Sequence, residues 1–223
     1  TTELLKVSGL ISETISLLNF CEPGMSHKEL ADNAVQADLL GKASASRMHD
    51  VVIDGFAKRY LRPDASAARN LKVLVEKNTE LNTLRQLFFL YTCRSQPILR
   101  DMVCEVYWPA QFSGKDRITM NDVRMFIVGS FGTEKNSGRW AESIIAKLSN
   151  SIPKCLTDFG LLGPYKRSGR EILPYTILNF TLNYILYDAH FKGLSDTQIL
   201  YLQDWELFGL QPAEVLALIR NTA

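Results

Sequence analysis

Apolar residues recur at three- and four-residue intervals through much of the chain, which is the spacing of one buried helix face. The first such stripe covers residues 4–18 and ends at Pro23-Gly24. A second helix is predicted from Ser26 to about residue 40, because Ser-His-Lys-Glu has the form of a capping box. A third follows the serines at residues 44 and 46 and ends before Pro63.

The same spacing predicts helices over residues 71–75, 81–91 and 98–106. Trp108-Pro109 and residues 113–116 then indicate a loop. We expect a boundary there, between an N-terminal helical region (1–112) and a C-terminal region (113–223) that resembles a winged helix with packed helices.

The C-terminal region is predicted to open with a helix at Thr119, followed by a helix that includes Leu148. Pro153 disfavours a helix interior, so residues 149–151 are interpreted as a turn that opens a separate short helix ending at Phe159. Two apolar flanks around a Ser-Gly pair predict a β-hairpin over residues 161–173, the only strand expected. Three more helices follow, over residues 175–190, from Ser195 and from Pro212. The predicted fold is mainly α and multi-helical, with helix-turn-helix and winged-helix-like elements and one short β-hairpin.

Composition places this 223-residue chain among ordinary globular proteins, with 46% hydrophobic and 22% charged residues. No stretch has the roughly 20 apolar residues of a membrane span, and the first residues lack the pattern of a signal peptide. The four cysteines lie far apart and form no C-x-x-C pair, which favours reduced thiols. We therefore expect a cytoplasmic protein that does not contact a membrane.

The net charge of +1 conceals two basic blocks. Residues 42–62 carry a net charge of +3 and residues 135–170 a net charge of +5, whereas residues 1–41 and 171–223 each carry −4. A polyanion responds to the local field, so such blocks indicate a nucleic-acid surface, although a solvated basic face is the alternative for either block.

The second block combines a predicted helix-turn-helix with a predicted wing. Asn150, Ser151 and Lys154 would begin the recognition helix, and Lys166, Arg167 and Arg170 would lie in the hairpin that contacts backbone or minor groove. Arg139 and Lys147 add charge to the same block. A helix docked in a scaffold with a harmless turn after it is the competing interpretation.

The first block predicts a second helix-turn-helix less clearly. The helices from Ser26 and Ser46 would place five residues near nucleic acid, namely Ser44, Ser46, Arg47, Lys58 and Arg59. Asp50 and Asp54 on the same face would repel phosphates. The cations near residue 60 are also typical of a solvated helix C-terminus, where positive charge is favoured by the helix dipole.

Enzyme motifs are scarce. The chain has no G-x-G-x-x-G, no P-loop, no G-x-S-x-G and no H-E-x-x-H, and its three histidines are widely separated. We therefore expect no catalytic residues, no metal and no cofactor.

Several short motifs resemble the BrxA family of the bacterial BREX phage-defence system. They are Trp140, Lys147-Leu148, residues 156–162, 169–174, Leu194-Ser195 and 205–210, with residues 42–47 and 58–61 in the N-terminal region. The resemblance implies a small all-helical cytoplasmic protein that is encoded beside a DNA methyltransferase and ATPases and has no catalytic residues. It supplies no set of ligand-contacting residues.

These observations favour a non-enzymatic protein that binds double-stranded DNA mainly through phosphates and assists other phage-defence proteins. An RNA-binding antitermination module resembling NusB is one alternative, although the basic blocks contain no aromatic stacking platform. A protein scaffold within the defence complex is the other.

Overall fold

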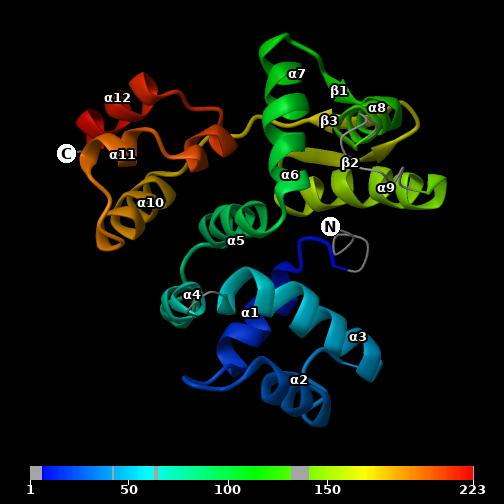
Figure 1. The fold of residues 1–223 in the computed structure, drawn as a ribbon, viewed down its shortest axis with the longest axis vertical. Coiled ribbons are helices and arrows are strands. Elements are labelled where there is room, and N and C mark those ends of the chain that lie inside the picture. The colour runs from blue at the N-terminus through cyan, green and yellow to red at the C-terminus, as the bar shows by residue number, and fades with distance from the viewer. Residues whose placement is uncertain (1–6, 42, 63–64, 132–140, 223) are drawn as a thin grey trace.

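Three groups of helices meet at one central helix, α5 (Leu81–Ser95), in the computed structural model of the protein (Figure 1). The structure describes residues 7–41, 43–62, 65–131 and 141–222. Helices α1 to α4 form the lower group in Figure 1, a small sheet with α8 and α9 forms the upper right group, and α10 to α12 form the upper left group. The predicted mainly helical fold class is confirmed.

The lower group consists of helices whose apolar faces share one core. Its elements are α1 (Ile11–Phe20), α2 (His27–Gln36), α3 (Ala45–His49), which continues as the π-helix η2 (Asp50–Leu61), and α4 (Ser66–Glu76). The predicted capping box of α2 is present, because the Ser26 hydroxyl accepts from the Glu29 N–H and the Glu29 carboxylate accepts from the Ser26 N–H. Ser44 caps α3 by accepting from the Arg47 N–H at 3.1 Å. Local cap chemistry therefore sets where both helices begin.

The first helix begins later than its apolar stripe predicts, because the preceding carbonyls bond elsewhere. The buried guanidinium of Arg59 donates to the carbonyls of residues 7–9 at 2.8 to 3.4 Å. The Gly9 N–H donates to the Asp158 carboxylate at 3.0 Å. A Cβ on Gly9 would lie 2.5 Å from the Cβ of Asp158, so the close approach requires glycine. The helix predicted over residues 7–10 is therefore wrong.

Helix α5 joins the three groups through its buried aromatic rings. The Phe89 ring centroid lies 5.6 to 5.9 Å from those of Phe159, Tyr175 and Phe208. Phe88 meets Tyr60 of the lower group at 5.9 Å. Edge-on aromatic contacts of this kind stabilise a core beyond simple burial.

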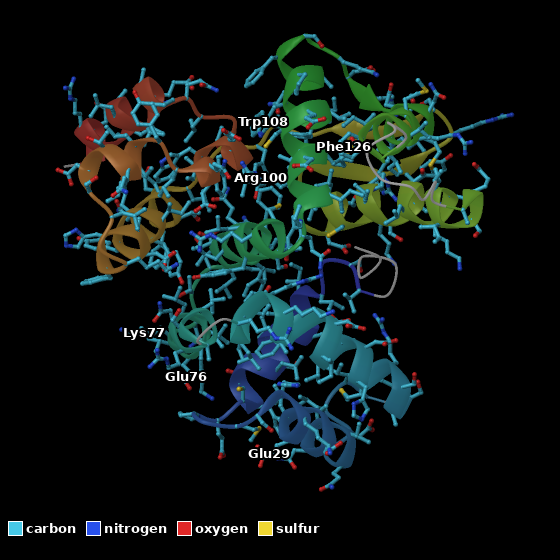
Figure 2. The ribbon with its side chains drawn as sticks, in the orientation of Figure 1. Glu29, Glu76, Lys77, Arg100, Trp108 and Phe126 are labelled. Carbon is cyan, nitrogen blue, oxygen red and sulfur yellow. The ribbon has the colours of Figure 1, made fainter. Side chains whose placement is uncertain are left out.

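A continuous helix leads from α5 toward the sheet. It comprises α6 (Pro97–Met102), the π-helix η3 (Val103–Tyr107) and α7 (Trp108–Phe112). The predicted loop at Trp108-Pro109 is therefore wrong. Proline has no N–H to donate to the carbonyl four residues earlier, and its ring would clash with that carbonyl in a regular α-helix. The wider π-helical turn before Pro109 avoids this clash. The Trp108 indole donates to the Leu207 carbonyl at 3.2 Å. Figure 2 shows Trp108 on the side of this helix toward the C-terminal group and Phe126 on the side of the sheet.

The sheet group has the order strand, helix, helix, strand, strand. It contains β1 (Arg117–Ile118), α8 (Met120–Phe131), α9 (Glu142–Asp158), β2 (Leu162–Lys166) and β3 (Gly169–Ile172). All pairings are antiparallel and the strand order is β1-β3-β2. The predicted hairpin is confirmed, whereas β1 was not expected.

Asp122 and Thr119 form the predicted cap of α8. The Asp122 carboxylate accepts from the Thr119 N–H at 2.8 Å, and the Thr119 hydroxyl accepts from the Asp122 N–H at 3.2 Å. Partial burial acts to raise the pKa of Asp122, but its bonds from Lys115 and Thr119 outweigh this and hold that pKa below its ordinary value.

The C-terminal group is attached to α5 by hydrogen bonds of Gln86 and ion pairs of Arg94. It contains α10 (Asn179–Phe191), α11 (Asp196–Leu200), the 3₁₀-helix η4 (Gln203–Phe208) and α12 (Pro212–Thr222). Helix α10 begins at Asn179 and not at residue 175, because the Gln86 amide bonds the Thr176 carbonyl and the Leu178 N–H of an extended segment at 2.7 and 2.9 Å. Arg94 bonds Asp204 at 2.7 Å and Asp188 at 3.0 Å.

The boundary between regions 1–112 and 113–223 stays a prediction.

Candidate nucleic-acid interface

Helix α9 presents a polar stripe on one side and apolar residues on the other. Lys147, Asn150 and Lys154 are exposed and share a face, since residues three and four apart are neighbours on a helix. Ser151 is half-buried at the edge of this stripe. The opposite side enters the core through Leu148, Ile152, Leu156 and the adjoining Phe159. The amphipathic division predicted from the sequence is confirmed.

The turn predicted at residues 149–151 is wrong, because α9 runs without interruption through Pro153. The Ser149 hydroxyl and the Asn150 amide each donate to the carbonyl four residues earlier, at 2.8 and 2.9 Å. Side chains that usually favour a turn are thus accommodated inside the helix. Asn150, Ser151 and Lys154 consequently lie in the middle of a 17-residue helix and not at the start of a short one.

The hairpin β2–β3 carries three cations of different character. Arg167 is exposed in the turn, and Lys166 is exposed but lies 3.5 Å from the Glu171 carboxylate. Arg170 is half-buried, and its guanidinium donates to the Thr157 hydroxyl at 3.1 Å and to the Gly163 carbonyl at 3.3 Å. Arg170 therefore fixes the hairpin against the end of α9.

Tyr165 adds an aromatic surface that sequence reasoning missed. The Arg170 guanidinium lies over the Tyr165 ring, 5.7 Å from its centroid, and Tyr165 is 59% exposed. Partial burial lowers the pKa of Arg170 from its ordinary value, although the guanidinium stays charged. Strand β2 is buried at its first two residues and exposed at its last three, which include Tyr165, so alternation along the strand could not have placed this ring.

A hollow of about 370 Å³ separates α9 from the hairpin. Asn150 and Pro153 line it from α9, Tyr165 and Arg170 from the hairpin, and Thr119 from the start of α8. Asn150 of the α9 stripe, Arg170 of the hairpin and the positive end of the α8 dipole thus line one concave surface. Such a surface suits a phosphate backbone.

The structure does not join the first basic block to this surface. Ser44 and Ser46 are exposed and Arg47 is half-buried at the beginning of α3, in the lower group (Figure 1). Lys58 pairs with Asp54 at 2.8 Å, near the other end of the same continuous helix. Arg139 lies outside the described residues.

Arg59 has to be removed from the predicted interface. Its side chain is 2% exposed and its guanidinium holds the carbonyls of residues 7–9. A buried guanidinium that is engaged in this way is unavailable to an external phosphate.

The part of the chain that the structure describes contains no cluster of three or more His, Cys, Asp or Glu side chains able to hold a metal ion. Burial raises the pKa of Cys104 to about 11 and that of Cys155 to about 12, so neither thiol is an activated nucleophile. Among the same residues, no helix is both long enough and apolar enough to cross a bilayer.

The fold and this surface define a mainly helical protein with a basic module built from a helix pair and a β-hairpin. A sequence profile of the BrxA family matches residues 1–187, so the chain belongs to the BrxA family. Family membership suggests an accessory protein of the BREX system, as the sequence motifs implied.

One solved structure of similar fold is the crystal structure of an uncharacterized protein from Magnetospirillum magneticum. It is 13% identical, with a TM-score of 0.66 over 85% of this chain and 93% of that chain. At this identity the likeness concerns the fold alone. A comparison with curated proteins returns no match.

Proposed function

We propose that the protein is a non-enzymatic accessory component of a BREX phage-defence system that binds double-stranded DNA through a winged-helix module. The observation that carries the proposal is the order α7, β1, α8, α9, β2, β3 with strand order β1-β3-β2. This is the order of winged-helix modules, in which the second helix of the pair enters the major groove and the hairpin lies along the backbone. Helix α9 would be the groove helix and β2–β3 the wing.

The charges of this module support phosphate contact. Residues 141–172 contain five basic and three acidic residues, and two of those acids, Glu142 and Glu171, lie beside Arg124 and Lys166. Lys147 and Lys154 flank Asn150 on the exposed stripe, and Arg167 extends from the wing. Asn150 is the one amide on the stripe that can reach a base edge, and its Nδ2 already bonds the Ala146 carbonyl. Binding should therefore be mainly electrostatic, with little sequence discrimination.

A salt titration with a neutralised variant tests the proposal. Changing Lys147, Lys154 and Arg167 to Gln removes three exposed cations and leaves Arg170, which holds the hairpin in place. If each cation neutralises one phosphate, the slope of log K against log salt becomes shallower by about 2.7. Fluorescence anisotropy of a labelled 20-base-pair duplex measures this slope.

The control removes three exposed cations elsewhere, by Lys28→Gln, Lys77→Gln and Arg220→Gln. Figure 2 shows Lys77 in the lower group, away from the hairpin. The control should keep the wild-type slope, and both proteins should melt like wild type. An unchanged slope in the α9 and wing variant would refute the assignment. A preference for duplex RNA would favour the antitermination alternative, and absence of binding at low salt would favour a scaffold.

A further inference from the structure

Two neighbouring hollows adjoin the start of α4, on the left of Figure 1. One lies between α4 and α10 of the C-terminal group, and the other is lined by the ends of η2 and α5 and by Lys192, which follows α10. Their volumes are about 270 and 380 Å³, and both are lined by Ser66 and Lys192. They therefore form one continuous groove, far in the fold from the α9 stripe and the wing.

One half of the groove is cationic. Lys58, Arg59, Arg62, Arg94 and Lys192 line it, and they come from three elements that the sequence separates widely. Three of these cations pair with carboxylates, through Asp54, Asp188 and Asp204. Among the described residues, Arg59 and Arg62 have no carboxylate partner, so this half of the groove keeps a positive field. Arg62 is exposed and can contact a ligand directly, whereas buried Arg59 acts through its charge.

The start of α4 strengthens this field. Ser66 and Ala67, the first residues of the 11-residue helix, line the cationic half. The positive end of a helix dipole favours phosphate oxygens.

The other half of the groove is aromatic. Tyr184, Tyr187 and Phe191 line it from α10, and Asn70 faces them from α4. The side chains of Tyr187 and Phe191 are 62% and 82% exposed, and their rings stack with centroids 6.2 Å apart. Asp188 is the one acid in this lining, and Arg94 and Lys192 neutralise it at 3.0 and 2.8 Å.

We propose that this groove binds single-stranded nucleic acid, with phosphates at the Arg62 half and bases stacked on Tyr187 and Phe191. A cationic groove that follows a backbone beside exposed aromatic rings is how proteins hold single strands without sequence preference. A duplex cannot use such rings, because its bases are already stacked. The site is independent of the duplex surface proposed above, and DNA and RNA single strands share the chemistry that it recognises.

The test measures binding of labelled oligo(dT) and oligo(U) of 12 nucleotides by fluorescence anisotropy across a salt series. Tyr187→Ala with Phe191→Ala should weaken binding about tenfold or more, because one stacked base is lost with each ring. Arg62→Gln should make the salt slope shallower by about 0.7, the value for one phosphate of a single strand. The relative affinities of the two oligonucleotides decide whether DNA or RNA is the preferred strand.

The matched control removes two equally exposed aromatic side chains outside the groove, by Phe112→Ala and Tyr201→Ala, which are 70% and 69% exposed in the wild type. It should bind both oligonucleotides like wild type, as should the Lys147, Lys154 and Arg167 variant that tests duplex binding. Circular dichroism melting confirms that each variant is folded. Absence of oligonucleotide binding at low salt would overturn the proposal. An unchanged affinity in the Tyr187 and Phe191 variant would also overturn it. This includes the result that the variant keeps its affinity but loses self-association in sedimentation.

Discussion

Gly169→Ala should detach the wing from the rest of the sheet. Gly169 has a φ of +118°, a backbone conformation that side chains rarely adopt, and a Cβ there would lie 2.6 Å from the Ile118 carbonyl oxygen. The atoms it meets belong to the backbone of β1 and the residue after it, so they cannot rotate away. Relief of the clash requires β1 to separate from β3.

The magnitude follows from two contributions. A strained backbone of this kind costs about 1 to 3 kcal/mol. Loss of β1–β3 hydrogen bonds adds about 1 kcal/mol for each bond. We therefore expect the free energy of unfolding to fall by about 3 kcal/mol, and duplex affinity to fall with it because the hairpin loses its position beside α9.

Gly163→Ala is the matched control on the same hairpin. Its Cβ would meet the Cβ of Glu171 at 3.4 Å, an ordinary contact, and Gly163 does not have the positive φ of Gly169. Urea denaturation gives the free energy of unfolding of both variants, and anisotropy gives their duplex affinity. If the two variants unfold within about 0.5 kcal/mol of each other, the steric argument for Gly169 is refuted.

Three further changes test other contacts. Arg94→Met should lower the free energy of unfolding by about 3 kcal/mol in urea denaturation, because the largely buried Asp204 carboxylate loses its cation and Asp188 keeps only Lys192. Asp204→Asn in the same chain should restore part of the loss. Asp122→Ala should lower it by about 1 kcal/mol at pH 7. Because folding lowers the pKa of Asp122, this difference should persist down to about pH 4 and vanish below it; a constant difference at pH 2 would contradict the assigned cap. Cys104 and Cys155 should react with a thiol reagent at pH 8 only after denaturation, and rapid reaction of the native protein would show that they are not protected.

Local chemistry made several elements predictable from the sequence. The caps at Ser26, Thr119 and Ser195 lie where their motifs indicated, because capping involves residues only three positions apart. The buried face of α9 and the β2–β3 hairpin also follow from local periodicity. The errors concern residues whose backbone bonds to distant partners. Arg59 and Asp158 hold residues 7–9, and Gln86 holds residues 176–178, outside any helix.

The candidate sites show the same limit. Charge along the chain was enough to propose Lys147, Lys154 and Arg167, because the helix and hairpin that carry them are neighbours in sequence. The groove between α4 and α10 was not found, because Arg62 and Phe191 are brought together only by the packing of both groups on α5. The expectation that the basic blocks have no aromatic platform overlooked Tyr165 inside the second block, and it did not concern Tyr187 and Phe191, which lie outside both blocks.

During synthesis, the residues that bury the Phe89 ring of α5 are made late. When the ribosome has added residue 112, Phe89 has been made, but Phe159, Tyr175 and Phe208, which cover its ring, have not. A nascent chain of that length leaves an apolar helix open to solvent or to chaperones. The protein should therefore acquire protease resistance in one late step, after η4 has left the ribosomal tunnel, and not in stages as each group of helices emerges.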